Sequence, residues 1–139
     1  MIAIIDSGGA NIASVTFALE RCGATAMLTT DAEMIASADK VILPGVGAAP
    51  VAMAQLQKAG LVDCIRGLTQ PVLGICLGMQ LLFERSEEGD TALLGLIPGM
   101  SGHTAVLRLF LIRRRSGCSH PGVACGFVCD VYSGVNAGS

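Results

Sequence analysis

Short apolar runs and stretches of helical spacing alternate along the first part of the chain. The expected strands are residues 2–5, 26–28, 40–43 and 71–75. Continuous apolar runs of this kind are typical of strands that are buried on both faces, as in a parallel sheet. Because the runs alternate with helical stretches over short connections, the pattern predicts an α/β fold with a doubly wound, mostly parallel sheet.

The helical stretches carry their own start and stop signals. Apolar positions from Ile12 onward follow helical spacing, and Gly23 is placed to end that helix in a left-handed cap. Asp31 is placed to cap a short helix over residues 32–36. Two further helices are expected, one with Pro50 in its first turn and an apolar face that includes Val51, Met53, Ala54 and Leu56, and one over residues 77–85.

A cysteine stands at the end of the fourth expected strand, in the segment Gly74-Ile75-Cys76-Leu77-Gly78. Sites in doubly wound sheets form at the carboxyl ends of strands, and a sharp strand-to-helix turn between glycines exposes the central residue in a strained conformation. This pattern predicts a nucleophile elbow with Cys76 as the nucleophile, and with the backbone N–H of Leu77 available to an oxyanion. The alternative is that Cys76 is one more buried thiol and that the glycines mark only a tight turn.

Two other strand ends are rich in glycine. Pro44-Gly45-Val46-Gly47 would supply further backbone N–H donors beside Cys76 if the two strands are neighbours, and is otherwise an ordinary turn. It has no Lys, Ser or Thr after its last glycine, so it is not a Walker phosphate loop. The end at residues 6–11 lacks the GxGxxG spacing of dinucleotide-binding folds.

Composition limits the class of protein. The 139 residues are 52% hydrophobic and 14% charged with a net charge of −2, which favours one soluble globular domain and gives no reason to expect a nucleic-acid partner. No uninterrupted apolar run reaches membrane-spanning length, and the N-terminus does not resemble a signal peptide. The six cysteines form no CxxC pair and no secreted framework. We therefore expect a cytoplasmic protein without a membrane partner.

Four segments, in this order and spacing, resemble the class I glutamine amidotransferases. More narrowly, they resemble the glutaminase subunit of imidazole glycerol phosphate synthase, an enzyme of histidine biosynthesis. The segments are residues 5–11, 43–47, 71–82 and 86–89. The resemblance implies a flavodoxin-like sheet that is incomplete at its C-terminus, and it implies no cofactor and no metal.

The resemblance also implies a reaction. Cys76 would attack the side-chain amide of glutamine, form a glutamyl thioester and release ammonia, after which water would free glutamate. Ammonia would pass to a (β/α)₈-barrel cyclase subunit in a heterodimer, which makes imidazole glycerol phosphate and an aminoimidazole carboxamide ribotide. The positions implied for the site are Cys76 as nucleophile, the backbone of Leu77, Val46 and Gly47 as oxyanion donors, and Gln80 and Glu88 as glutamine-binding residues. From the residues alone, Gln80 and Glu88 are more often read as solvated helix or loop residues.

The family's catalytic base is not found. Class I amidotransferases supply it in a late His-Pro-Glu motif, whereas here His120-Pro121 is followed by Gly122 and the only other histidine is His103. The resemblance ends near residue 100, which divides the chain into an amidotransferase part, residues 1–100, and an atypical tail, residues 101–139. The hypothesis for the tail is a shifted reading frame or another truncating change, so that it is not amidotransferase sequence or is disordered.

Several readings stay open. One is an active glutaminase subunit, and another is a catalytically dead remnant that at most docks on the cyclase. A third is the glutaminase subunit of an enzyme that serves anthranilate, aminodeoxychorismate or pyridoxal phosphate synthesis, although residues 80–89 favour the histidine branch. A tail zinc site is a further alternative with no standard ligand spacing, from His103, Cys118, His120, Cys125 and Cys129.

Overall fold

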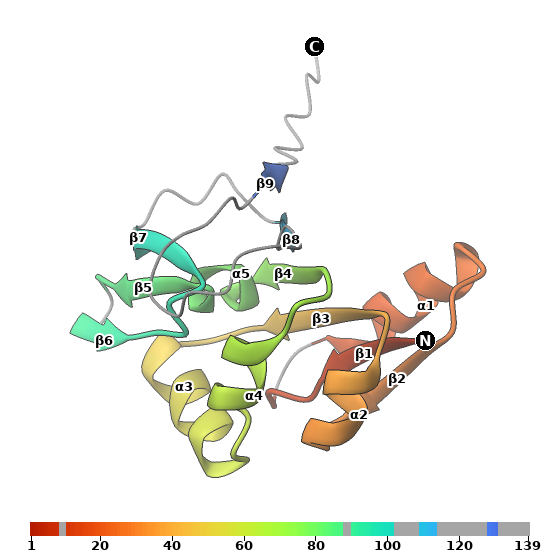
Figure 1. Cartoon of the computed structure of the whole chain (residues 1–139), viewed down its shortest axis with the longest axis horizontal. Coiled ribbons are helices and arrows are strands. Elements are labelled where there is room, and N and C mark those ends of the chain that lie inside the picture. The colour runs from red at the N-terminus through yellow and green to blue at the C-terminus, as the bar shows by residue number, and fades with distance from the viewer. Residues whose placement is uncertain (9–10, 88–89, 102–108, 114–127, 131–139) are drawn as a thin grey trace.

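The computed structural model describes residues 1–8, 11–87, 90–101, 109–113 and 128–130. Its main sheet has six strands in the order β2-β1-β3-β4-β8-β9, and a second sheet has three in the order β6-β5-β7 (Figure 1). The strands of the main sheet are β1 (Ile2–Ile5), β2 (Ala26–Thr29), β3 (Lys40–Gly45), β4 (Val72–Cys76), β8 (Leu109–Arg113) and β9 (Val128–Asp130). Those of the second sheet are β5 (Phe83–Ser86), β6 (Thr91–Ala92) and β7 (Ile97–Ser101).

Strands β1 to β4 pair parallel with one another, as the apolar runs predicted. Across the sheet these strands lie in the order β2-β1-β3-β4. The chain moves from β1 to one side of the sheet, to β2, and then returns to the other side, to β3 and β4. The place between β1 and β3 is therefore the topological switch point, where doubly wound sheets form their sites. Strand β8 then pairs antiparallel with β4, and β9 antiparallel with β8. The predicted α/β class and doubly wound sheet are therefore confirmed.

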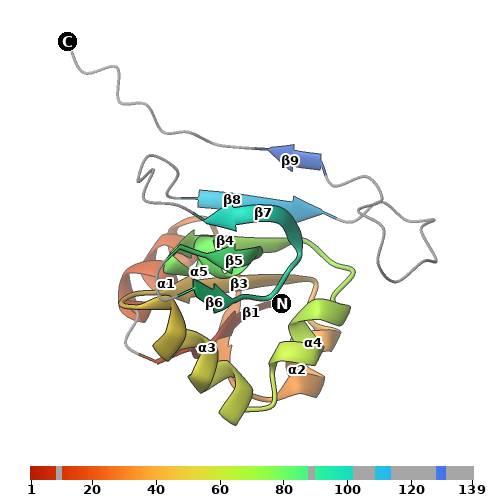
Figure 2. The same ribbon diagram turned by 90° about the vertical axis from the view of Figure 1, so that its left-hand side faces the viewer.

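Five helices are found among the described residues. They are α1 (Ile12–Arg21), α2 (Ala32–Ser37), α3 (Ala49–Lys58), α4 (Val62–Gly67) and α5 (Leu77–Leu81). Helices α2, α3 and α4 gather on one face of the main sheet, with α1 on the other (Figure 1), and Figure 2 shows the same layers from the side. No helix in the described part of the chain is both long and apolar enough to cross a bilayer.

The core lies between the sheet and the helices α2 to α5. Ile5, Leu43, Leu56 and Leu81 are fully buried there. Helix α1 has no buried residue, and the Phe17 side chain on it is 61% exposed. The hydrophobic interior is therefore concentrated on one face of the sheet.

The predicted caps are present. Gly23 has φ +72° and donates its backbone N–H to the Glu20 carbonyl, which closes the end of α1. The Asp31 carboxylate accepts the N–H of Glu33 at the start of α2, and Pro50 lies in the first turn of α3.

The predicted apolar face of α3 is partly wrong. Met53 and Leu56 are buried, but Val51 is 58% exposed and Ala54 is also exposed. The buried positions are Ala49, Ala52, Met53 and Leu56. These four follow the spacing of one helical stripe, and Val51 and Ala54 lie outside it.

The helix predicted over residues 77–85 ends at Leu81 instead. Residues 83–86 form β5, which pairs with β6 and β7. The carbonyls of residues 81–84 are taken by a segment that returns from further along the chain. The acceptors are Leu81, Leu82, Phe83 and Glu84, and the donors are Leu93, Leu94, Gly95, Leu96 and Ile97. Because the leucines of this segment are buried, tertiary packing overrides the local helical pattern.

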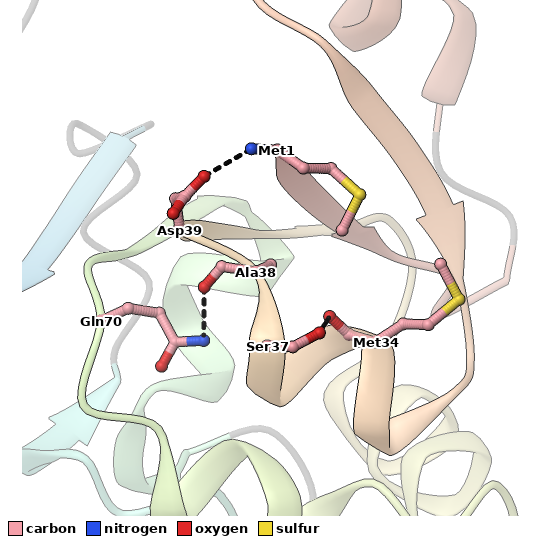
Figure 3. A network of polar contacts seen from close by, with 6 residues as sticks. All are labelled: Met1, Met34, Ser37, Ala38, Asp39 and Gln70. Carbon is pink, nitrogen blue, oxygen red and sulfur yellow. Dashed lines mark hydrogen bonds and ion pairs between the residues drawn. The ribbon is translucent and has the colours of Figure 1, made fainter.

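A side chain from the loop before β4 closes the end of α2. The Gln70 amide nitrogen donates to the carbonyls of Ile35, Ala36 and Ala38, at 3.0, 3.2 and 3.1 Å. Figure 3 shows this amide directed at Ala38, beside the ion pair between the Met1 ammonium and Asp39. The contacts tie the start of β4 to the helix that precedes β3, and so help to hold these two strands in register.

Candidate nucleophile site

Cys76 ends β4 and stands directly before α5, with an exposed side chain. Its backbone has φ 54° and ψ −120°, a conformation that costs free energy in a residue with a side chain. Such strain persists only where surrounding structure imposes it, and it is the conformation expected of a nucleophile elbow. The exposure of the thiol argues against the reading of Cys76 as a buried core cysteine.

Three glycines explain how the elbow closes so tightly. A Cβ on Gly78 would lie 1.8 Å from the Leu43 carbonyl oxygen, and one on Gly74 would lie 2.6 Å from the Cα of Met79. A Cβ on Gly45 would lie 2.8 Å from the backbone nitrogen of Gly78. The backbones of β3, β4 and α5 therefore approach one another at distances that only glycine permits.

The second glycine-rich turn lies beside Cys76. Strands β3 and β4 are neighbours, and their register pairs Gly45 with Cys76. Val46 and Gly47 follow at once; the Val46 side chain is 51% exposed, and Gly47 has φ +93°. Open space surrounds the position of a Cβ on Gly47. The condition for backbone donors beside the nucleophile, that the two strands be adjacent, is met.

The other predicted site residues are distributed as follows. Leu77 is the first residue of α5, where a helix leaves backbone N–H groups without intrahelical partners, and its side chain is buried. Gln80 lies one turn further along α5 and is half-buried. Glu88 lies outside the described residues, as do both histidines, His103 and His120.

A metal site finds no support in the described ranges, where no cluster of three or more His, Cys, Asp or Glu side chains could hold an ion. Of the five residues in the alternative zinc set, only Cys129, in β9, lies within those ranges. The remaining four lie outside the described residues.

One contact near the site was not foreseen from the sequence. Ser7, just after β1, is 3% exposed, and its hydroxyl donates to the Pro44 carbonyl oxygen at 2.8 Å. Pro44 directly precedes the Gly45 that pairs with Cys76. The sequence contains no local signal for this contact, because the two residues are 37 positions apart.

Comparison with known proteins places these features in a family. Residues 3–114 match the family model described as Glutamine amidotransferase class-I. The chain is 59% identical over 102 residues to "Imidazole glycerol phosphate synthase subunit HisH" of Xanthomonas axonopodis pv. citri (strain 306), which covers 73% of this chain and 51% of that relative. The protein of the same name from Xylella fastidiosa (strain Temecula1 / ATCC 700964) is 56% identical over 98 residues, 70% of this chain and 49% of the relative.

The chain thus spans about half the length of the curated relatives it matches. A solved structure titled "Crystal structure of glutamine amidotransferase" superposes with a TM-score of 0.63 at 19% identity, covering 84% of this chain and 75% of that one. At that identity the superposition supports the fold alone. The family match over most of the chain supports more: the chain belongs to the class I glutamine amidotransferases.

Proposed function

We propose that this chain is the nucleophile-bearing part of the glutaminase subunit of imidazole glycerol phosphate synthase. The observation that carries the proposal is the pairing of Gly45 with a strained, exposed Cys76 at the carboxyl edge of the sheet. The pairing supports the proposal because Val46 and Gly47 follow Gly45 directly, and Leu77 follows Cys76 directly at the start of α5. The choice of enzyme rests on the names of the relatives, and for a glutaminase subunit the proposed substrate is glutamine.

In the proposed reaction the Cys76 sulfur attacks the side-chain amide carbon of glutamine. A sulfur–carbon bond forms and the carbonyl oxygen gains negative charge, which the N–H groups of Leu77, Val46 and Gly47 would stabilise. The carbon–nitrogen bond then breaks, and ammonia leaves once its nitrogen has received a proton. Water hydrolyses the resulting thioester to glutamate and restores the thiol. Gln80 and Glu88 would hold the rest of the glutamine.

The proton for the leaving nitrogen requires an acid, which is the role of the family's histidine. The described part of the chain contains no histidine, and neither His103 nor His120 stands in a His-Pro-Glu motif. We therefore propose that the site binds glutamine-like electrophiles, which readily alkylate Cys76, but that it turns glutamine over slowly. We also propose that most of residues 101–139, the part beyond the family match that ends at residue 114, is not amidotransferase sequence, and that the chain is cytoplasmic.

The proposed partner is the (β/α)₈-barrel cyclase subunit, in a heterodimer that receives the ammonia. The carboxyl edge of β1, β3 and β4 is the edge that holds Cys76, so the ammonia would leave the chain at that edge. Gel filtration of the chain with the cyclase subunit tests the pairing, with either protein alone as the reference. Elution of each protein at its own volume would exclude a stable heterodimer.

The test of the chemistry uses two reagents. Glutamate release is measured with glutamine, the cyclase subunit and the cyclase substrate, and we expect little or no turnover. Labelling is measured with a glutamine analogue whose side-chain amide is replaced by a chloromethyl ketone, and we expect modification of Cys76 in preference to the exposed Cys22.

The outcomes separate the proposals. Substantial glutamate release that is abolished by Cys76→Ser would refute the proposal that the chain lacks a catalytic base. Equal labelling of Cys22 and Cys76 would refute the glutamine site itself. Selective labelling without turnover, and without binding to the cyclase subunit, would leave a glutamine-binding remnant.

A further inference from the structure

Pro44 occupies an unusual place for proline, inside a strand with neighbours on both sides. It lies in β3, which runs between β1 and β4, and it is buried. Proline has no backbone N–H, so the only hydrogen-bonding group that it offers to a neighbour is its carbonyl. A buried carbonyl without a partner costs free energy, so the partner of this one matters.

A side chain supplies a partner for this carbonyl. The register of β1 and β3 pairs residues up to Ile4 and Ile42, whereas that of β3 and β4 continues to Gly45 and Cys76. Toward β1, the end of β3 is instead held by the Ser7 hydroxyl, which donates to the Pro44 carbonyl oxygen at 2.8 Å. With Ser7 only 3% exposed, water does not readily replace this bond.

This contact lies at the boundary between buried and exposed residues. Pro44 and Gly45 are buried and held from both sides, by Ser7 and by β4. Immediately beyond them, the Val46 side chain is half exposed and Gly47 has open space around it. The peptide between Pro44 and Gly45 is therefore the buried, hydrogen-bonded peptide that directly precedes the exposed Val46–Gly47 turn.

We infer that Ser7 is a positioning residue for the oxyanion donors. Its hydroxyl fixes the plane of the Pro44–Gly45 peptide, and this plane sets the direction from which Val46 and Gly47 present their N–H groups to an oxygen on Cys76. The inference rests on the proposed glutaminase function. Without the hydroxyl, the Pro44 carbonyl rotates to find another donor, and the turn rotates with it.

The experiment measures alkylation of Cys76 in the full chain by mass spectrometry of the peptide that contains it. With the glutamine chloromethyl ketone, the sulfur first adds to the carbonyl carbon, so the carbonyl oxygen becomes an oxyanion and the thiol proton passes to solvent. The sulfur then moves to the methylene carbon, the carbonyl re-forms and chloride leaves. Iodoacetamide is the reference reagent, because its displacement of iodide develops no oxyanion. Saturation kinetics give a maximal rate and a half-saturating concentration for the chloromethyl ketone.

For Ser7→Ala we expect the maximal chloromethyl ketone rate to fall about fivefold, the factor that corresponds to one typical hydrogen bond. The half-saturating concentration and the iodoacetamide rate stay within about twofold of the original chain. Ser7→Thr keeps the hydroxyl and restores at least half of the lost rate. Ser37→Ala is the matched control: it removes a serine hydroxyl that donates to the Met34 carbonyl at the end of α2, and it leaves every rate unchanged.

Three results would overturn the inference. One is an unchanged chloromethyl ketone rate in a folded Ser7→Ala chain, and another is an equal loss of rate with both reagents, which indicates a general loss of structure. The third is a Thr variant as slow as the Ala variant. If Ser7→Ala does not fold, Ser7→Cys, of similar size and with a weaker donor, replaces it with the same expected direction. Failure of the original chain to prefer the chloromethyl ketone at Cys76 overturns the proposed function instead, and this inference with it.

Discussion

Replacing Gly78 by alanine tests whether the elbow depends on close backbone approach. The new Cβ would lie 1.8 Å from the Leu43 carbonyl oxygen and 2.7 Å from the carbonyl carbon. Real Cβ atoms essentially never come closer than 3.0 Å to another heavy atom, so α5 and β3 must separate by more than about 1 Å. Both groups in conflict belong to backbone, which cannot turn away as the end of a side chain can.

Overpacking a well-packed interior costs about 1–3 kcal/mol, and a conflict with the backbone of a central strand belongs at or above the upper end. We therefore expect Gly78→Ala to lower the free energy of unfolding by about 3 kcal/mol or more. With a urea dependence of about 1.5 kcal/mol per molar, the midpoint of urea unfolding falls by about 2 M. Far-ultraviolet circular dichroism across a urea series measures it.

Gly67→Ala is the matched control, since Gly67 is the last residue of α4 and a Cβ there meets nothing within 4 Å. It should leave the midpoint unchanged or raise it, because alanine lowers the entropy of the unfolded chain by an amount worth about 0.5 kcal/mol. A Gly78→Ala midpoint within about 0.3 M of the original chain would refute the argument that glycine is required at the elbow.

Three further outcomes are expected. Arg66→Leu should cost about 2 kcal/mol in urea unfolding, because the guanidinium donates to two backbone carbonyls of the returning segment, at 2.9 and 3.1 Å; a loss below about 0.5 kcal/mol would contradict this. Burial raises the pKa of the Cys64 thiol, so iodoacetamide at pH 8 should modify it more slowly than the exposed Cys22, and the Cys64 rate should climb as the pH rises to about 10. Hydrogen bonding and charge from the Met1 ammonium lower the pKa of Asp39. A carboxyl whose pKa is lowered by folding stabilises the fold at pH values above its ordinary pKa of 3.8, and this stabilisation is lost as the pH falls below that value. Asp39→Asn should therefore lower the thermal midpoint slightly at pH 7, by less in high salt, and not at all once the pH is well below 3.8.

The parallel strands and the elbow were predictable because each depends on a local pattern. Four apolar runs marked the first four strands of the sheet, and glycine two residues to either side of Cys76 marked the turn. The adjacency of β3 and β4 could only be posed as a condition, since strand order depends on contacts between distant segments. The role of Gly45, which packs against Gly78, was hidden for the same reason.

The features that the sequence did not predict correctly also have physical causes. Helix α5 stops early because the carbonyls of residues 81–84 bond to residues 93–97, and a window centred on residue 80 does not contain those donors. Helix α4 was not expected, since it has six residues and no side-chain cap at Leu61. The contact between Ser7 and Pro44 joins the loop after β1 to the end of β3 and leaves no periodic signal.

The segment that completes α5 also sets an order for folding during synthesis. Leu94, Leu96 and Ile97 donate the hydrogen bonds that close the helix behind Cys76, and they follow it by about twenty positions. A nascent chain that has released Cys76 from the ribosome therefore still lacks the groups that hold the elbow's helix in place. The thiol becomes part of a rigid site only after Ile97 has emerged, so pausing between these two points would expose a reactive cysteine on an unfinished sheet.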